Sequence, residues 1–158
     1  MKAECLIVMI LLICAQAFNV PNNGSTQHWF KINDTNYVIE LAITANFWSA
    51  MEYCTSHNMQ LVSMDTLEEN SEVYAQVSNI VLNNSLNFWS AGNILGDDKS
   101  IWIWMTTGKV ISINSWRARE PNTQRLTDLC LSLLYPKDEN GWWTAHPCTT
   151  RDAFICKQ

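Results

Sequence analysis

Four cysteines restrict the fold of this 158-residue chain more than any other feature of its sequence. They are Cys54, Cys130, Cys148 and Cys156, and three of them lie close to the C-terminus. An even number of cysteines in a secreted chain predicts disulfides, and four cysteines allow three pairings. None of them forms a C-x-x-C pair, which argues against a four-cysteine zinc site. We therefore expect two disulfides that fix the C-terminal part of the chain.

Secretion is inferred from the first residues of the chain. Residues 1–17 have the three parts of a signal peptide: Lys2, the apolar run Leu6–Ile13 and the cleavage motif Ala15-Gln16-Ala17. The apolar run is shorter than the roughly 20 residues that span a bilayer. Two further cysteines lie within this segment and would be removed with it. The sequence thus predicts a secreted, extracellular protein without a membrane span.

The segment after the signal peptide is polar and has no pattern of packed residues. Residues 18–27 contain Pro21 and Gly24 and are expected to form a flexible N-terminal arm. N-glycosylation sequons begin at Asn23, Asn33 and Asn83. In a secreted chain, all three asparagines are candidate glycan acceptors.

Composition indicates one globular domain that does not bind nucleic acid. The chain is 47% hydrophobic and 16% charged, which is typical of a packed core. Its formal net charge of −5 argues against a nucleic-acid partner, because phosphate contacts need a basic patch. The eight tryptophans are explained either as core residues or as platforms on which a sugar ring stacks.

Hydrophobic periodicity predicts an α+β fold with two helices and short antiparallel strands. The helices are expected at 46–58 and 66–82, the second one opened by a capping box at Thr66 and Glu69. Strands are expected at 29–32, 37–41, 60–63, 101–105, 129–135, 142–144 and 153–157, and the chain from residue 87 onward is expected to consist of strands and loops. Residues 111–116 lead into a long loop.

This long loop carries the candidate site. Glu120 and Asn122 flank Pro121, and Asp128 lies two residues before Cys130. Side-chain oxygens on a loop suit a hard cation such as calcium, and they also suit the hydroxyls of a sugar. The sequence contains no nucleophile motif, H-E-x-x-H motif or phosphate-binding glycine loop, so we do not expect an enzyme.

Several motifs in this order resemble those of a C-type lectin-like domain, of the short secreted kind common in insects. Glu120-Pro121-Asn122 matches the mannose-type triplet of that family, and Trp104–Gly108 resembles its tryptophan-containing strand and turn. Trp143-Thr144-Ala145 stands where the family has Trp-Asn-Asp shortly before a cysteine. The four cysteines match the framework of the family, and the resemblance covers residues 28–158.

The resemblance implies the disulfides Cys54–Cys156 and Cys130–Cys148. It also implies a cis peptide bond before Pro121. Glu120, Asn122 and Asp128 match calcium ligands of the family, and Thr144 matches a further position of its calcium and carbohydrate site.

The sequence departs from the family at Thr144 and Ala145, which replace an amide and a carboxylate ligand. We therefore expect weak calcium binding. The Glu-Pro-Asn order implies mannose-type sugars, although galactose stays open. The alternative is a secreted module that recognises a protein ligand without calcium.

Overall fold

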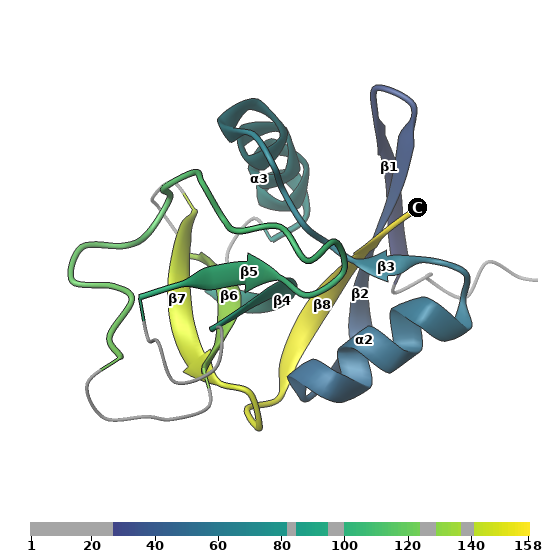
Figure 1. Ribbon diagram of the computed structural model, residues 1–158. Coiled ribbons are helices and arrows are strands. Elements are labelled where there is room, and N and C mark those ends of the chain that lie inside the picture. Colours follow the sequence, from purple (N-terminus) through teal and green to yellow (C-terminus); the bar gives the residue numbers. More distant parts are fainter. Residues whose placement is uncertain (1–26, 82–84, 95–99, 124–128, 137–140) are drawn as a thin grey trace, which may run out of the picture.

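The described part of the computed structural model comprises residues 27–81, 85–94, 100–123, 129–136 and 141–158. Within these ranges the chain forms two helices and an eight-stranded sheet (Figure 1), which confirms the predicted α+β class. The helices are α2 (Phe47–Ser56) and α3 (Leu67–Val81). The strands are β1 (Gln27–Ile32), β2 (Thr35–Ala45), β3 (Gln60–Leu61), β4 (Leu86–Ile94), β5 (Trp102–Trp104), β6 (Leu129–Tyr135), β7 (Trp142–Pro147) and β8 (Asp152–Lys157).

The sheet brings the end of the chain into its middle. The strand order is β1-β2-β8-β4-β6-β7, while β3 pairs with β8 and β5 pairs with β4. The C-terminal strand β8 thus lies between the N-terminal hairpin and β4, and its pairing with β4 is parallel. Neither described helix is long and apolar enough to cross a membrane.

Helix α2 lies within the predicted helix at 46–58. A polar cap stabilises its start, and an apolar face packs it against the core. The Asn46 side chain accepts a hydrogen bond of 2.8 Å from the Ser49 N–H, which satisfies a free amide of the first turn. Phe47, Ala50 and Cys54 are buried at helical spacing.

Helix α3 begins at the predicted capping box, with one difference. The Thr66 hydroxyl accepts from the Glu69 N–H at 3.1 Å, as the motif requires. The Glu69 carboxylate, however, accepts a hydrogen bond from the Asp65 N–H rather than from the Thr66 N–H of the motif. It also accepts a hydrogen bond from the Tyr37 hydroxyl. Glu69 therefore joins the start of α3 to β2 as well as capping it.

The strands confirm most of the predicted positions, but several of their lengths differ. Gln27, expected in the flexible arm, is the first residue of β1 because it pairs with Glu40 in the hairpin. Strand β2 is longer than predicted, since it pairs with β8 as well as with β1. Strand β3 is reduced to Gln60 and Leu61, and β7 continues to Pro147 along β6.

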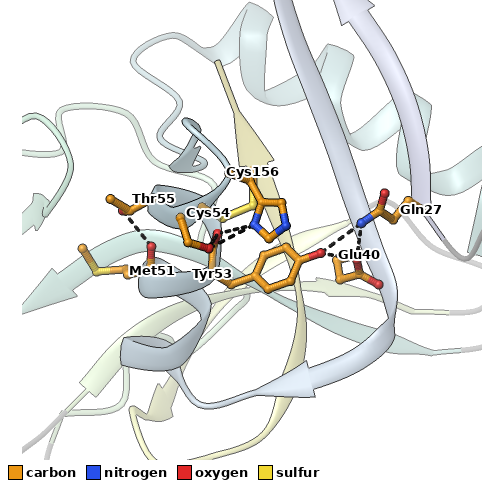
Figure 2. The surroundings of a disulfide bond; sticks show 9 residues. Gln27, Glu40, Met51, Tyr53, Cys54, Thr55 and Cys156 are labelled. Carbon is orange, nitrogen blue, oxygen red and sulfur yellow. Dashed lines mark hydrogen bonds between the residues drawn. A yellow bond between two sulfur atoms is a disulfide. The ribbon is translucent and has the colours of Figure 1, made fainter.

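Both disulfides have the pairing that the resemblance implied. Cys54–Cys156 joins α2 to β8 with a Cα–Cα distance of 5.6 Å, and Cys130–Cys148 joins β6 to the turn after β7 with 5.0 Å. Figure 2 shows Glu40 among the residues around the first disulfide. Glu40 is 2% exposed, and it accepts hydrogen bonds from Gln27 Nε2 at 2.8 Å and the Tyr53 hydroxyl at 3.0 Å. These bonds compensate the cost of burying its charge.

Three of the tryptophans form part of the core that supports the long loop. Trp89, Trp104 and Trp143 are almost completely buried. The rings of Trp104 and Trp116 both meet the Trp143 ring edge to face, with centroids 5.8 and 5.7 Å away. Such contacts fix ring positions as well as burying apolar area. The core explanation therefore holds for these tryptophans.

Candidate functional site

The long loop between β5 and β6 is attached to β7 by its backbone. The Trp143 N–H donates to the Ser115 carbonyl at 2.8 Å, and the Arg117 N–H donates to the Trp143 carbonyl at 2.9 Å. Together they form a parallel bridge between Trp116 and Trp143. Figure 1 shows this part of the loop, in green, next to β7. The segment before Glu120 is thus held in register with the strand that carries Thr144 and Ala145.

Asn70 of α3 forms hydrogen bonds with both the loop and the strand. Its side chain is 4% exposed. Its Oδ1 accepts a hydrogen bond from Trp143 Nε1 at 2.9 Å, and its Nδ2 donates to Ser115 Oγ at 3.2 Å. Sequence periodicity placed Asn70 on the helix but gave no sign of this role, because both partners are more than 40 residues away.

We expect Asn70→Ala to lower the free energy of unfolding by about 2 kcal/mol, because a buried indole N–H would lose its partner. The loop would also lose its link to α3 at Ser115. Urea unfolding measures the change. Asn79→Ala is the matched control, an exposed asparagine of the same helix, and should change stability by less than about 0.5 kcal/mol. Equal effects of the two substitutions would contradict this role of Asn70.

Glu120 links the loop to β7 through its carboxylate. Its Oε2 accepts hydrogen bonds from the Asn122 N–H at 3.0 Å and the Ala145 N–H at 3.2 Å. The Glu120–Pro121 peptide bond is cis, as the resemblance implied. The structure therefore brings Glu120, Asn122 and the backbone of Ala145 together at one place, where Asn122 is exposed.

The Thr144 hydroxyl forms its hydrogen bonds with residues other than Glu120 and Asn122. The side chain is 6% exposed, and its Oγ1 donates to the Ser132 carbonyl at 3.2 Å. It also lies 3.4 Å from His146 Nε2. The carboxylate of Asp152 then accepts from Ser132 Oγ and His146 Nδ1, both at 3.2 Å.

These four side chains form a polar cluster inside the sheet that sequence reasoning missed. The only signal in the sequence was Thr144 and His146, two apart on one strand. Pairing of this strand with β6 adds Ser132, and Asp152 of β8 joins through its side chain. The Thr144 hydroxyl is therefore engaged within the cluster, whereas Ala145 is the residue of this pair that contacts Glu120.

The remaining predicted residues are placed as follows. Asp128 lies outside the described residues, as do the sequon asparagines Asn23 and Asn83 and the whole of residues 1–17. Asn33 is exposed in the turn between β1 and β2, with a φ of 50°. A glycan attached at Asn33 would not disturb the core.

The described side chains fit calcium in part. Glu120 offers a carboxylate and Asn122 offers an amide oxygen, and calcium requires six to eight oxygens. The described ranges contain no cluster of three His, Cys, Asp or Glu residues that could hold a metal ion. Glu120 and Asn122 therefore supply only part of the oxygen set that a calcium ion requires.

Comparison with known proteins places this fold and loop in one family. The family model of the C-type lectin domain matches residues 43–158, which is most of the chain. The chain belongs to the C-type lectin domain family. C-type lectin domains are binding modules rather than enzymes, in agreement with the lack of catalytic motifs.

Two insect lectins are among the proteins with a similar sequence. The chain is 24% identical to lectin subunit alpha of Sarcophaga peregrina over 157 residues, covering 95% of this chain and 52% of that protein. It is 26% identical to salivary C-type lectin 1 of Aedes albopictus over 120 residues, covering 73% and 78%. The chain thus spans about half the length of the first of these relatives.

Solved structures share the fold at low sequence identity. The carbohydrate-recognition domain of the human scavenger receptor C-type lectin superposes with a TM-score of 0.68 at 21% identity, covering 83% of this chain and 95% of that one. CEL-IV superposes with a TM-score of 0.70 at 16% identity, covering 82% and 90%.

Proposed function

We propose that this chain is a secreted lectin that binds carbohydrate, of mannose type, at a weak calcium site formed by Glu120, Asn122 and Asp128. The observation that supports this most is the position of the Glu120 carboxylate between the Asn122 and Ala145 amides. Residues 1–17 are proposed as its signal peptide and 18–26 as the arm before β1. Asn23, Asn33 and Asn83 are the proposed glycosylation sites.

The loop supplies the chemistry that a sugar diol requires. Calcium, when bound, would accept two sugar hydroxyls in place of water. The Glu120 carboxylate accepts hydrogen bonds from hydroxyls, while the Asn122 amide nitrogen donates to them. This acceptor-before-donor order supports sugars with equatorial 3- and 4-hydroxyls, such as mannose and N-acetylglucosamine. Because Oε2 is already bonded to two backbone amides, the carboxylate is oriented before any ligand arrives.

Weak calcium binding follows from the composition of the strand that faces Glu120. Ala145 has no side-chain oxygen, and the Thr144 hydroxyl donates to the Ser132 carbonyl. Water would fill these positions without adding charge or fixed geometry. We expect a calcium dissociation constant on the order of a millimolar or weaker, at the weak end of extracellular modules.

A second candidate function is recognition of a protein ligand without calcium. The replacement of two family ligands by Thr144 and Ala145 favours it. The solved structures that share the fold include proteins described as lithostathine and as a calcium-dependent type II antifreeze protein, so the fold occurs in proteins with other descriptions. Galactose in place of mannose is a further alternative within the sugar function.

Retention on immobilised sugars separates these functions. The full chain is applied to mannose and galactose resins with calcium, and again with EDTA. We expect retention on mannose that EDTA removes and that Glu120→Gln abolishes. Glu68→Gln, which changes an exposed glutamate of α3, is the matched control and should be retained like the unmodified chain. Failure to bind either resin in calcium would favour the protein-ligand function, and retention on galactose alone would exclude mannose.

A further inference from the structure

A groove lies between helix α3 and the place where the long loop meets the start of β7. Its volume is about 420 Å³, within the range of about 300–1,000 Å³ that is typical of small-molecule sites. Helix α3 lines it with Ser71, Ala75 and Ser78, and the other side is lined by Ser115, Gly141 and Trp142. All described residues of the lining are uncharged, and neither Glu120 nor Asn122 is among them. The groove is thus distinct from the site at Glu120.

The two sides of the groove are held in place by the fold. Asn70 of α3 bonds both Ser115 Oγ and Trp143 Nε1, so it joins the helix to the loop and to β7. A Cβ at Gly141 would lie 1.8 Å from the Tyr74 ring. The chain can therefore approach Tyr74 this closely only because residue 141 has no side chain. A cavity that exists before the ligand arrives lowers the cost of binding.

Trp142 supplies an aromatic surface to the groove. It is half-buried, and it is part of the lining. In the described part of the chain, ring contacts connect Trp102 to Trp116, and Trp104 and Trp116 to Trp143, whereas Trp142 has no such contact. The core explanation therefore does not account for this ring, which is available to pack against the apolar face of a ligand.

The polar groups of the lining can both accept and donate hydrogen bonds. The hydroxyls of Ser71 and Ser78 each donate to the carbonyl four residues earlier, at 2.8 Å, so their lone pairs can still accept. The Ser115 hydroxyl accepts from Asn70 Nδ2 and can still donate. A neutral ligand with several hydroxyl groups matches this set, because no lining group offers a charge to pair with an ion.

Tyr74, in the same lining, has a buried hydroxyl without a hydrogen-bond partner among the described residues. The residue is 8% exposed, and burial raises the pKa of its hydroxyl, which is therefore neutral. Native proteins rarely leave a buried hydroxyl without a partner, and each such group requires an explanation. Its place in the lining of a groove is explained if the groove holds a polar ligand.

We propose that this groove is a second sugar site, which binds a neutral pyranose without calcium. One C–H face of the sugar packs on the Trp142 ring, and its hydroxyls form hydrogen bonds with Ser71, Ser78 and Ser115. A β-glucoside suits this arrangement, because its ring hydroxyls are all equatorial and both faces of the ring carry only C–H groups. The site uses no carboxylate and no metal, so it is independent of the proposed calcium site at Glu120.

Titration with methyl β-glucoside in EDTA tests this proposal, because EDTA removes calcium from the site at Glu120. The full, isotope-labelled chain is followed by NMR. We expect saturable shifts of the Trp142 indole signal and of the Ser71 and Ser78 amide signals, with a dissociation constant on the order of 10 mM. The Asn122 amide signal should not shift under these conditions.

Two substitutions in the groove separate binding from folding. Ala75→Arg fills the groove from an exposed helix position, so it should abolish binding in EDTA and leave Tm unchanged. Asn79→Arg adds the same charge at an exposed position one turn further along α3 and outside the lining, and this control should bind like the natural chain. Trp142→Ala should weaken binding about tenfold or more, because it removes the aromatic surface.

The remaining outcomes distinguish this site from the one at Glu120. A titration in EDTA without saturable shifts, or with shifts confined to residues outside the groove, would overturn the proposal. Binding that survives both Ala75→Arg and Trp142→Ala would also overturn it. Saturable binding in EDTA by a chain that is not retained on mannose resin in calcium would support the groove and reject the site at Glu120.

Discussion

Ala145→Asp combined with Thr144→Asn is expected to tighten calcium binding at least tenfold and sugar binding with it. The Ala145 N–H already donates to the Glu120 carboxylate, so an aspartate at 145 would add a second carboxylate beside the first. Two carboxylates at one place repel each other without a cation and bind a divalent cation strongly with one. The gain should therefore appear with calcium only. Without calcium, the double variant should have a lower free energy of unfolding than the natural chain.

Single substitutions show how much each residue contributes to calcium binding. Ala145→Asp alone should give most of the gain, since the Thr144 hydroxyl is engaged with the Ser132 carbonyl inside the sheet. Glu120→Ala should abolish binding of calcium and sugar, because it removes the carboxylate that the loop and β7 orient. Calorimetry measures the calcium affinity of the natural chain, the double variant, Ala145→Asp and Glu120→Ala. Micromolar affinity in the natural chain, or no gain in the double variant, would show that other residues form the site.

Removal of Cys54–Cys156 is expected to cost about 5 kcal/mol of stability, the largest stability effect of any change considered. The disulfide closes a loop with a sequence separation of 102, and in the chain-entropy model a loop of this length contributes about 4.7 kcal/mol. The total free energy of unfolding of native proteins is only about 5–15 kcal/mol. The Cys54→Ser and Cys156→Ser double variant should therefore be unfolded or nearly so at 37 °C.

Removal of the second disulfide, Cys130–Cys148, provides a comparison within the same protein. Cys130–Cys148 has a sequence separation of 18, for which the same model gives about 3 kcal/mol. The Cys130→Ser and Cys148→Ser variant should keep its fold and show a smaller loss in urea unfolding. A larger loss for this pair than for Cys54 and Cys156 would contradict the loop-length argument.

The sequence by itself determined the local elements and the family framework. Asn46 and Thr66 mark helix starts because a capping side chain acts within three residues of its own position. Strand β6 was located at its observed bounds, since a continuous apolar run next to a turn is a local signal. The disulfide pairing and the cis bond before Pro121 followed from the resemblance, and the structure agrees with both.

Only the tertiary structure decided which side chains belong to the site. Thr144 and Ala145 are neighbours in sequence, yet on a strand their side chains point to opposite faces, and only pairing with β6 shows which face holds the Ser132 cluster. Asn70 and Trp143 are 73 residues apart, so no local pattern could predict their hydrogen bond. The left-handed backbone conformation of Arg119, with a φ of 71°, is likewise invisible in the sequence, because the backbone conformation of a turn depends on what the turn connects. Periodicity and spacing report contacts between near neighbours, whereas the candidate site is assembled from segments that only the folded sheet brings together.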